Sequence, residues 1–140
     1  MKQILYKCYF DGSCYPKNPH GQMGMGVYIT SGDQEYCKSE HRPAKHKNSN
    51  NVAEYLAVIM LLKIMRKKKG CVINIYGDSK MVIYQLHHHW KVKNGYYVKH
   101  AREAKKLYDE LCENNLVCMF WIPREKNWKA DELSKANQKV

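Results

Sequence analysis

Residues 73–79 read Ile73-Asn74-Ile75-Tyr76-Gly77-Asp78-Ser79. The short, mostly apolar run over residues 71–76 is typical of a strand that is buried on both faces. Directly after it, residues 79–86 have the pattern of a short helix. A buried strand followed by a helix is the repeating unit of sheets whose faces are covered by helices. This stretch therefore predicts an α/β fold.

Upstream of this stretch, the sequence predicts three strands and one long helix. The expected strands cover residues 4–10, 25–30 and 35–40. Ser31-Gly32-Asp33 is a hairpin turn signal, so the three strands form an antiparallel meander. A Gly/Pro/Asn-rich loop over residues 12–21 separates the first two strands. The helix begins after a cap at Ser49 or Asn50 and runs to about Lys68.

Downstream, helices and strands continue to alternate. The pattern predicts a helix over residues 98–113, a strand over 116–122, a loop over 123–127 and a final helix over 128–137. The predicted order is therefore βββαβααβα. It indicates one α/β domain over residues 1–140, with a five-stranded mixed sheet, three antiparallel strands followed by parallel strands, flanked by helices.

The composition restricts the classes of partner that the protein is expected to bind. Lys and Arg number 24 against 13 acidic residues, a formal net charge of +11, which favours nucleic acid, although a basic surface can also serve solubility or bind acidic membranes. The longest apolar stretch, residues 52–65, contains Glu54 and Lys63 and is too short to span a bilayer. The N-terminal residues 1–7 do not have the pattern of a signal peptide. We expect a monomer without membrane contact that is cytoplasmic, or nuclear if the host is a eukaryote.

The cysteines are expected to be free thiols. Cys8, Cys14, Cys37, Cys71, Cys112 and Cys118 form no CxxC pair. Six cysteines are able to pair in principle, but without a secretion signal the reduced form is favoured. Zinc finger spacing is absent from the sequence.

Four acidic residues lie where secondary-structure elements begin or end: Asp11, Glu54, Asp78 and Asp131. The first strand is expected to end at Asp11 and the fourth near Asp78. If these strands are central and parallel, their C-terminal ends meet at the edge where open α/β sheets bind ligands. Several carboxylates in one cleft repel one another, and some stay protonated without metal. Mg²⁺ prefers carboxylate oxygens, and two such ions about 4 Å apart promote phosphodiester hydrolysis.

Each carboxylate also has an ordinary structural interpretation. Asp11 before Gly-Ser suits a turn, and Glu54 suits the dipole at a helix N-terminus. Asp78-Ser79 suits an N-cap, and Asp131 suits a solvated helix position. Taken singly, each of these is at least as good as a metal-ligand role. The order of the four and the residues around them favour the shared role.

Four motifs resemble those of type 1 ribonuclease H, in the family's order. They are Asp11-Gly12-Ser13, Asn50-Asn51-x-x-Glu54, Gly77-Asp78-Ser79 and Ala130-Asp131-Glu132-Leu133-Ser134. The resemblance covers nearly the whole chain and implies the ribonuclease H fold. It also implies metal-dependent cleavage of the RNA strand of an RNA/DNA hybrid, with Mg²⁺, or Mn²⁺ in its place, held by the four carboxylates as two ions when substrate is bound.

The resemblance also implies substrate contacts. Gly12, Ser13, Asn50 and Asn51 match positions that touch the hybrid and its 2′-hydroxyls, with Cys14 beside them and Ser79 after the third carboxylate. Short polar side chains, and a glycine that lets the backbone come close to the substrate, suit recognition of a 2′-hydroxyl.

Two departures from the family pattern stand out. Many members have a His in the loop before the last Asp; here residues 122–127 contain none, and the loop resembles a shorter version found in some relatives. Arg124 or Lys126 is then a candidate for contact with phosphate. A basic protrusion present in some members also looks missing. Trp90 with the nearby lysines then offers a reduced surface for the DNA strand, although Trp90 suits a core position equally well.

The sequence therefore favours a ribonuclease H that acts on RNA/DNA hybrids. Two alternatives remain: a non-catalytic nucleic-acid-binding module of the same fold, and a same-fold nuclease that acts on double-stranded RNA. The four carboxylates argue against the first, because acidic groups repel phosphate. Asn50-Asn51 and Gly12-Ser13 favour the hybrid over the second.

Overall fold

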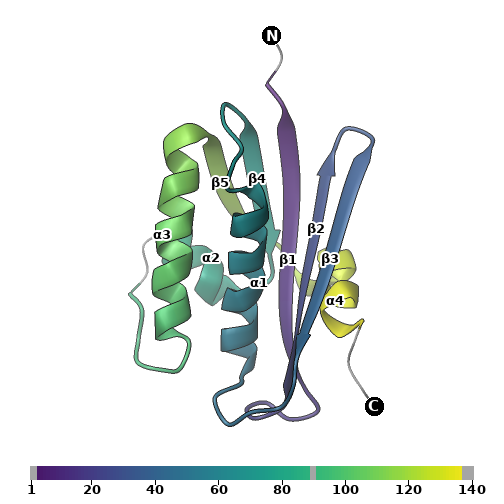
Figure 1. The fold of residues 1–140 in the computed structure, drawn as a ribbon, viewed down its shortest axis with the longest axis vertical. Helices are drawn as coiled ribbons and strands as arrows, with labels where there is room; N and C mark the ends of the chain where they lie inside the picture. Colours follow the sequence, from purple (N-terminus) through teal and green to yellow (C-terminus); the bar gives the residue numbers. More distant parts are fainter. Residues whose placement is uncertain (1–2, 89–90, 137–140) are drawn as a thin grey trace.

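The computed structural model describes residues 3–88 and 91–136. Figure 1 shows one five-stranded sheet with helices on both faces. Its strands are β1 (Leu5–Tyr15), β2 (Gln22–Ser31), β3 (Gln34–Arg42), β4 (Val72–Gly77) and β5 (Leu116–Trp121). They lie in the order β3-β2-β1-β4-β5, with β1 to β3 antiparallel and β4 and β5 parallel to β1. The predicted mixed sheet is confirmed.

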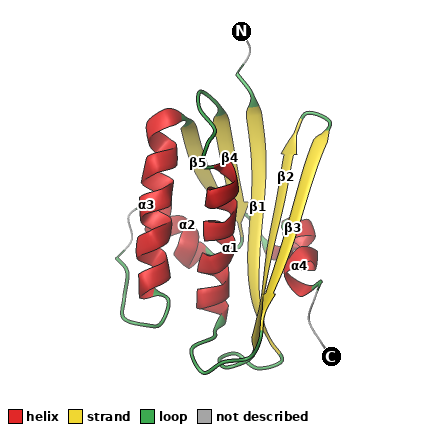
Figure 2. Ribbon diagram, in the orientation of Figure 1, coloured by secondary structure: helices red, strands yellow, loops and turns green. Residues whose placement is uncertain are grey.

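The helices divide between the two faces of the sheet (Figure 2). They are α1 (Asn50–Met65), α2 (Lys80–His87), α3 (Val98–Asn114) and α4 (Trp128–Lys135), with the short 3-10 helix η1 (Arg124–Lys126) before α4. α1 packs on β1 and on α3 at one face, while α4 packs on β1, β2 and β3 at the other. Within the described part of the chain, no helix is both long and apolar enough to cross a membrane.

The main core lies between the sheet and α1. Cys8 and Phe10 of β1, and Met25 and Val27 of β2, point into it at alternate positions, as a half-covered strand requires. α1 is apolar around most of its circumference because α3 covers the side that the sheet does not. The Ser49 hydroxyl caps α1 by accepting from Val52 N at 3.2 Å. Asn50 is thus free of the capping role that the sequence had left open.

The predicted end of the first strand is wrong. β1 does not end at Asp11 but continues to Tyr15, because β2 goes on pairing with it from Asp11↔Gly26 to Tyr15↔Gln22. The pairing of β1 with its parallel neighbour β4 ends earlier, at Tyr9↔Tyr76. Asp11 therefore lies just beyond the last residue of β1 that pairs with β4, in a part of β1 that pairs only with β2.

Two glycines of β2 allow α4 to lie directly on the sheet. A Cβ on Gly24 would lie 1.6 Å from the carbonyl oxygen of Ser134, and one on Gly26 would lie 2.4 Å from that of Ala130. Cβ atoms cannot approach backbone so closely, so the helix backbone occupies the space that larger residues would fill. This contact positions the helix that carries Asp131.

Candidate active site

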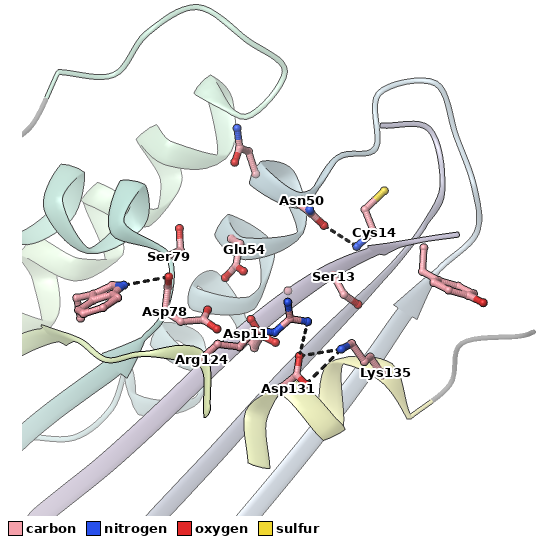
Figure 3. A pocket seen from close by; sticks show the side chains of 14 residues that line it. Asp11, Ser13, Cys14, Asn50, Glu54, Asp78, Ser79, Arg124, Asp131 and Lys135 are labelled. Atoms are coloured by element: carbon pink, nitrogen blue, oxygen red, sulfur yellow. Dashed lines mark hydrogen bonds and ion pairs between the residues drawn. The ribbon is translucent and has the colours of Figure 1, made fainter. Parts of the chain in front are cut away.

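A pocket of about 600 Å³ opens where β1 passes the end of β4 (Figure 3). Its walls come from β1, α1, the β4–α2 turn, β5, η1 and α4. The lining residues are Asp11, Gly12, Ser13, Cys14, Tyr15, Asn50, Asn51, Glu54, Asp78, Ser79, Trp121, Arg124, Asp131 and Lys135. Every expected metal ligand and 2′-hydroxyl contact is among them. Trp90, the expected DNA-strand contact, lies outside the described residues.

Three of the four expected carboxylates form one cluster. Asp11 of β1, Glu54 of α1 and Asp78 after β4 each offer an oxygen, and these oxygens all lie within 4.8 Å of one another. The parallel pairing of β1 and β4 brings Asp11 and Asp78 to the same edge, and α1 carries Glu54 over it. Asp131 of α4 lines the same pocket beside Asp11 but does not belong to this cluster.

Burial and mutual repulsion make the cluster unfavourable when it is fully ionised. Burial, the charge of Asp78 and a hydrogen bond to Asp131 raise the pKa of Asp11 from its ordinary 3.8 to about 8. Burial, with Asp11 and Asp78 nearby, holds the pKa of Glu54 well above its usual range. Burial also raises the pKa of Asp78, although a hydrogen bond to Asp11 and the charge of Arg124 act against it.

Asp131 is in the opposite electrostatic situation. Its burial alone would raise its pKa, but a hydrogen bond to Asp11, together with Lys135 and Arg124, outweighs that effect and holds the pKa below its ordinary value. Lys135 Nζ lies 3.2 Å from Oδ1 and 3.3 Å from Oδ2, and Arg124 Nη2 lies 3.6 Å from Oδ1. Asp131 is therefore the one of the four carboxylates whose pKa is lowered, so its ionised form is favoured.

The donor set of the cluster fits a divalent cation. Glu54 Oε2 is buried and finds no hydrogen-bond partner among the described residues. A buried carboxylate oxygen without a partner is costly, so such an atom calls for an explanation. An all-oxygen set of three carboxylates is the kind of site that Mg²⁺ and Mn²⁺ occupy. A cation bound there would give Glu54 Oε2 a partner and offset the repulsion among the three carboxylates.

We expect the metal-free protein to lose stability as the pH rises from about 4 to about 8. Folded Asp11, with its pKa of about 8, holds a proton that the unfolded chain, at 3.8, has already released. The folded state binds more protons across this interval, so raising the pH favours unfolding. Thermal melts in EDTA from pH 5 to 8.5 test this. The decline should be smaller in Asp11→Asn and in wild type with Mg²⁺; equal pH slopes for wild type and Asp11→Asn would contradict it.

The family assignment rests on comparison with known proteins. A model of the RNase H family matches residues 3–139. The chain belongs to the RNase H family. Ribonuclease H of Clostridium botulinum is 30% identical, with 96% of this chain and 94% of that relative covered. A bifunctional protein of Mycobacterium tuberculosis is 32% identical over 84% of this chain, which spans only 31% of that relative's length.

Solved structures of the RNase H family share the fold. LC11-RNase H1, isolated from compost and crystallised in complex with an RNA/DNA hybrid, is 28% identical with a TM-score of 0.80, and 94% of each chain is covered. RNase H1 of Halobacterium salinarum is 26% identical, with a TM-score of 0.73 and coverage of 94% of this chain and 95% of that one. The ribonuclease H fold implied by the motifs is confirmed.

The residues expected to touch substrate also hold the pocket together. Asn50 Oδ1 accepts from Cys14 N at 2.9 Å, and Ser13 Oγ donates to the Ser134 carbonyl at 3.3 Å. Ser79 Oγ caps α2 by accepting from Val82 N at 3.3 Å. The contacts of Ser13 and Cys14 tie β1 to α4 and α1, and that of Ser79 fixes the start of α2, so a substrate meets polar groups that are already positioned.

Gly12 has a structural role that the sequence did not reveal. A Cβ at this position would lie 2.2 Å from the backbone carbon of Ala53 and 2.4 Å from Glu54 N. Gly12 therefore allows β1 to lie close to α1, next to Glu54. Gly12 itself is buried.

Three pocket residues were not predicted from the sequence: Tyr15, Trp121 and Lys135. Trp121 Nε1 donates to the backbone carbonyl of Asp78 at 3.1 Å, because β5 pairs Trp121 with Gly77 at the end of β4. Lys135 lies four residues after Asp131 on α4, and this i,i+4 spacing was the available signal. Arg124, expected to meet phosphate, lines the pocket, whereas Lys126 does not.

Proposed function

We propose that this chain is a divalent-metal-dependent endonuclease that hydrolyses the RNA strand of RNA/DNA hybrids and leaves 5′-phosphate and 3′-hydroxyl ends. The cluster of Asp11, Glu54 and Asp78, with its unpartnered Glu54 oxygen, is the observation that carries the proposal. A surplus of basic residues in a chain with a formal net charge of +11 supports a polyanionic substrate. Membership of the RNase H family supports the reaction class.

Asp11, Glu54 and Asp78 would hold Mg²⁺, or Mn²⁺ in its place, and Asp131 with Asp11 would help to hold a second ion in the substrate complex. Two such ions supply an activated water and stabilise the leaving oxygen, so no Ser or Cys nucleophile is needed. Asp11 and Glu54 favour their protonated forms without metal, because burial raises the pKa of each. Loading of the site should therefore release protons.

The rest of the pocket suits an RNA strand. Ser13, Asn50, Asn51 and Ser79 line it beside the carboxylates, and such short polar groups can hydrogen-bond to 2′-hydroxyls. The 2′-hydroxyl distinguishes RNA from DNA, which accounts for cleavage of the RNA strand only. The relative LC11-RNase H1, crystallised with an RNA/DNA hybrid, supports the same substrate for this chain.

Cleavage of an end-labelled RNA/DNA hybrid tests the proposal, beside the same RNA single-stranded and in an RNA duplex. We expect cuts in the RNA strand of the hybrid with Mg²⁺ or Mn²⁺, none in EDTA, and products that a 5′-phosphate-dependent exonuclease degrades. Binding of the hybrid without cleavage in any metal would indicate a non-catalytic module. Equal cleavage of the RNA duplex would show that the site does not require a DNA strand.

A further inference from the structure

Two cations from different elements meet at Asp131, as Figure 3 shows. Arg124 reaches it from η1 at 3.6 Å, and Lys135 from the last turn of α4 at 3.2 Å. The side chains of Arg124 and Lys135 are 69% and 43% exposed, whereas that of Asp131 is 24% exposed. The carboxylate is thus sheltered and its two partners are accessible from the pocket.

The pairing separates Asp131 from the other three carboxylates. Asp11, Glu54 and Asp78 share one cluster without a lysine or arginine in an ion pair with any of them among the described residues, and their pKa values are raised. Asp131 contacts Asp11, yet its charge is already balanced by protein cations. A divalent ion that used Asp131 as a ligand would have to compete with both cations.

Phosphate can release this pairing. Both cations are exposed to solvent, which weakens their ion pairs with Asp131, so a stronger anion can displace the carboxylate. Arg binds phosphate with two parallel hydrogen bonds, and Lys binds it as a compact point charge. Both cations line the pocket that a nucleic-acid backbone must enter to reach the carboxylates.

We propose that Arg124 and Lys135 hold Asp131 in the free protein and transfer to a substrate phosphate when nucleic acid binds, so that Asp131 becomes available as a metal ligand only in the complex. This inference rests on the proposed function, because it assumes that a phosphodiester enters the pocket. Arg124 and Lys135 are then positioning residues that couple substrate binding to completion of the metal site. Free protein would load the three-carboxylate cluster alone.

The double variant Arg124→Gln/Lys135→Met tests this in two assays with expected shifts of opposite sign. In calorimetric titration of the free protein with Mn²⁺, the variant should bind the ion about 3- to 30-fold more tightly or bind an additional ion, because two exposed ion pairs no longer compete. In EDTA, the same variant should bind the hybrid more weakly. Its plot of log affinity against log salt should be shallower by roughly 1 to 2, because two phosphate contacts are lost.

Lys129→Met is the matched control, because it removes one positive charge from the same helix, where Lys129 pairs with Glu132 at 3.8 Å outside the pocket. It should change neither Mn²⁺ affinity nor stoichiometry. The single variant Lys135→Arg, which keeps the positive charge, should resemble wild type in both Mn²⁺ binding and hybrid binding. Unchanged Mn²⁺ binding in the double variant would overturn the inference, and so would weaker binding of both ligands, which a purely structural role would produce.

The two proposals can fail separately. If wild type cleaves the hybrid but the double variant binds Mn²⁺ just as wild type does, the inference is wrong and the proposed function stands. Wild type that neither binds nor cleaves the hybrid would remove the proposed function and, with it, the transfer to phosphate.

Discussion

Asp11→Asn should abolish cleavage of an RNA/DNA hybrid and leave binding of the hybrid largely intact. Asp11 is the carboxylate that the other three share: it lies in the cluster with Glu54 and Asp78 and also contacts Asp131. An amide keeps the shape but loses the charge that holds a cation. Loss of an outer-shell partner typically costs about 10- to 100-fold in activity, so loss of this central ligand should cost more.

Single-turnover cleavage and hybrid binding in EDTA measure the two halves of this expectation. Asp33→Asn is the matched control, because Asp33 is exposed in the turn between β2 and β3 and lies outside the pocket. In EDTA at pH 7 the Asp11→Asn protein should be at least as stable as wild type, since it removes a carboxyl whose pKa burial raises to about 8. Cleavage at the wild-type rate would show that the metal site is assigned wrongly.

Gly12→Ala should destabilise the protein and displace Glu54. The added Cβ would lie 2.2 Å from the backbone carbon of Ala53 and 2.4 Å from Glu54 N. Backbone atoms cannot rotate away as a side-chain end can, so α1 must move from β1. Overpacking of this kind typically costs about 1–3 kcal/mol. Because the shift occurs at the residue that carries the carboxylate, Mn²⁺ affinity and cleavage should fall together with stability.

Urea unfolding and Mn²⁺ titration measure the effect of Gly12→Ala. Ser13→Ala is the control on the same strand, since it removes the hydroxyl that donates to Ser134 O at 3.3 Å and adds no volume. It should cost about 1 kcal/mol at most, as the loss of one hydrogen bond does. If Gly12→Ala is as stable as wild type and binds Mn²⁺ equally well, the close approach of β1 and α1 is not a constraint on this site.

Much of the fold follows from local patterns in the sequence. The apolar run that becomes β4 and the turn at Gly32, whose φ is +58°, were predicted from short-range signals. The apolar helix α1 begins at its expected cap, Ser49, although it ends at Met65 rather than Lys68. Such elements are predictable because periodicity, capping and turn chemistry involve residues that are close in sequence. The family motifs likewise predicted which carboxylates share a pocket.

Other features depended on contacts between distant parts of the chain. β1 reaches Tyr15 because β2 pairs with its polar end, and Gly12 is required by α1. Lys135 becomes a pocket residue because Gly24 lets α4 lie on the sheet. The sequence by itself determined the order of the elements and the identity of the four carboxylates, since these are encoded locally. Only the tertiary structure decided that three of them form one buried to half-buried cluster while Asp131 is paired with Arg124 and Lys135, because burial and charge compensation arise from long-range packing.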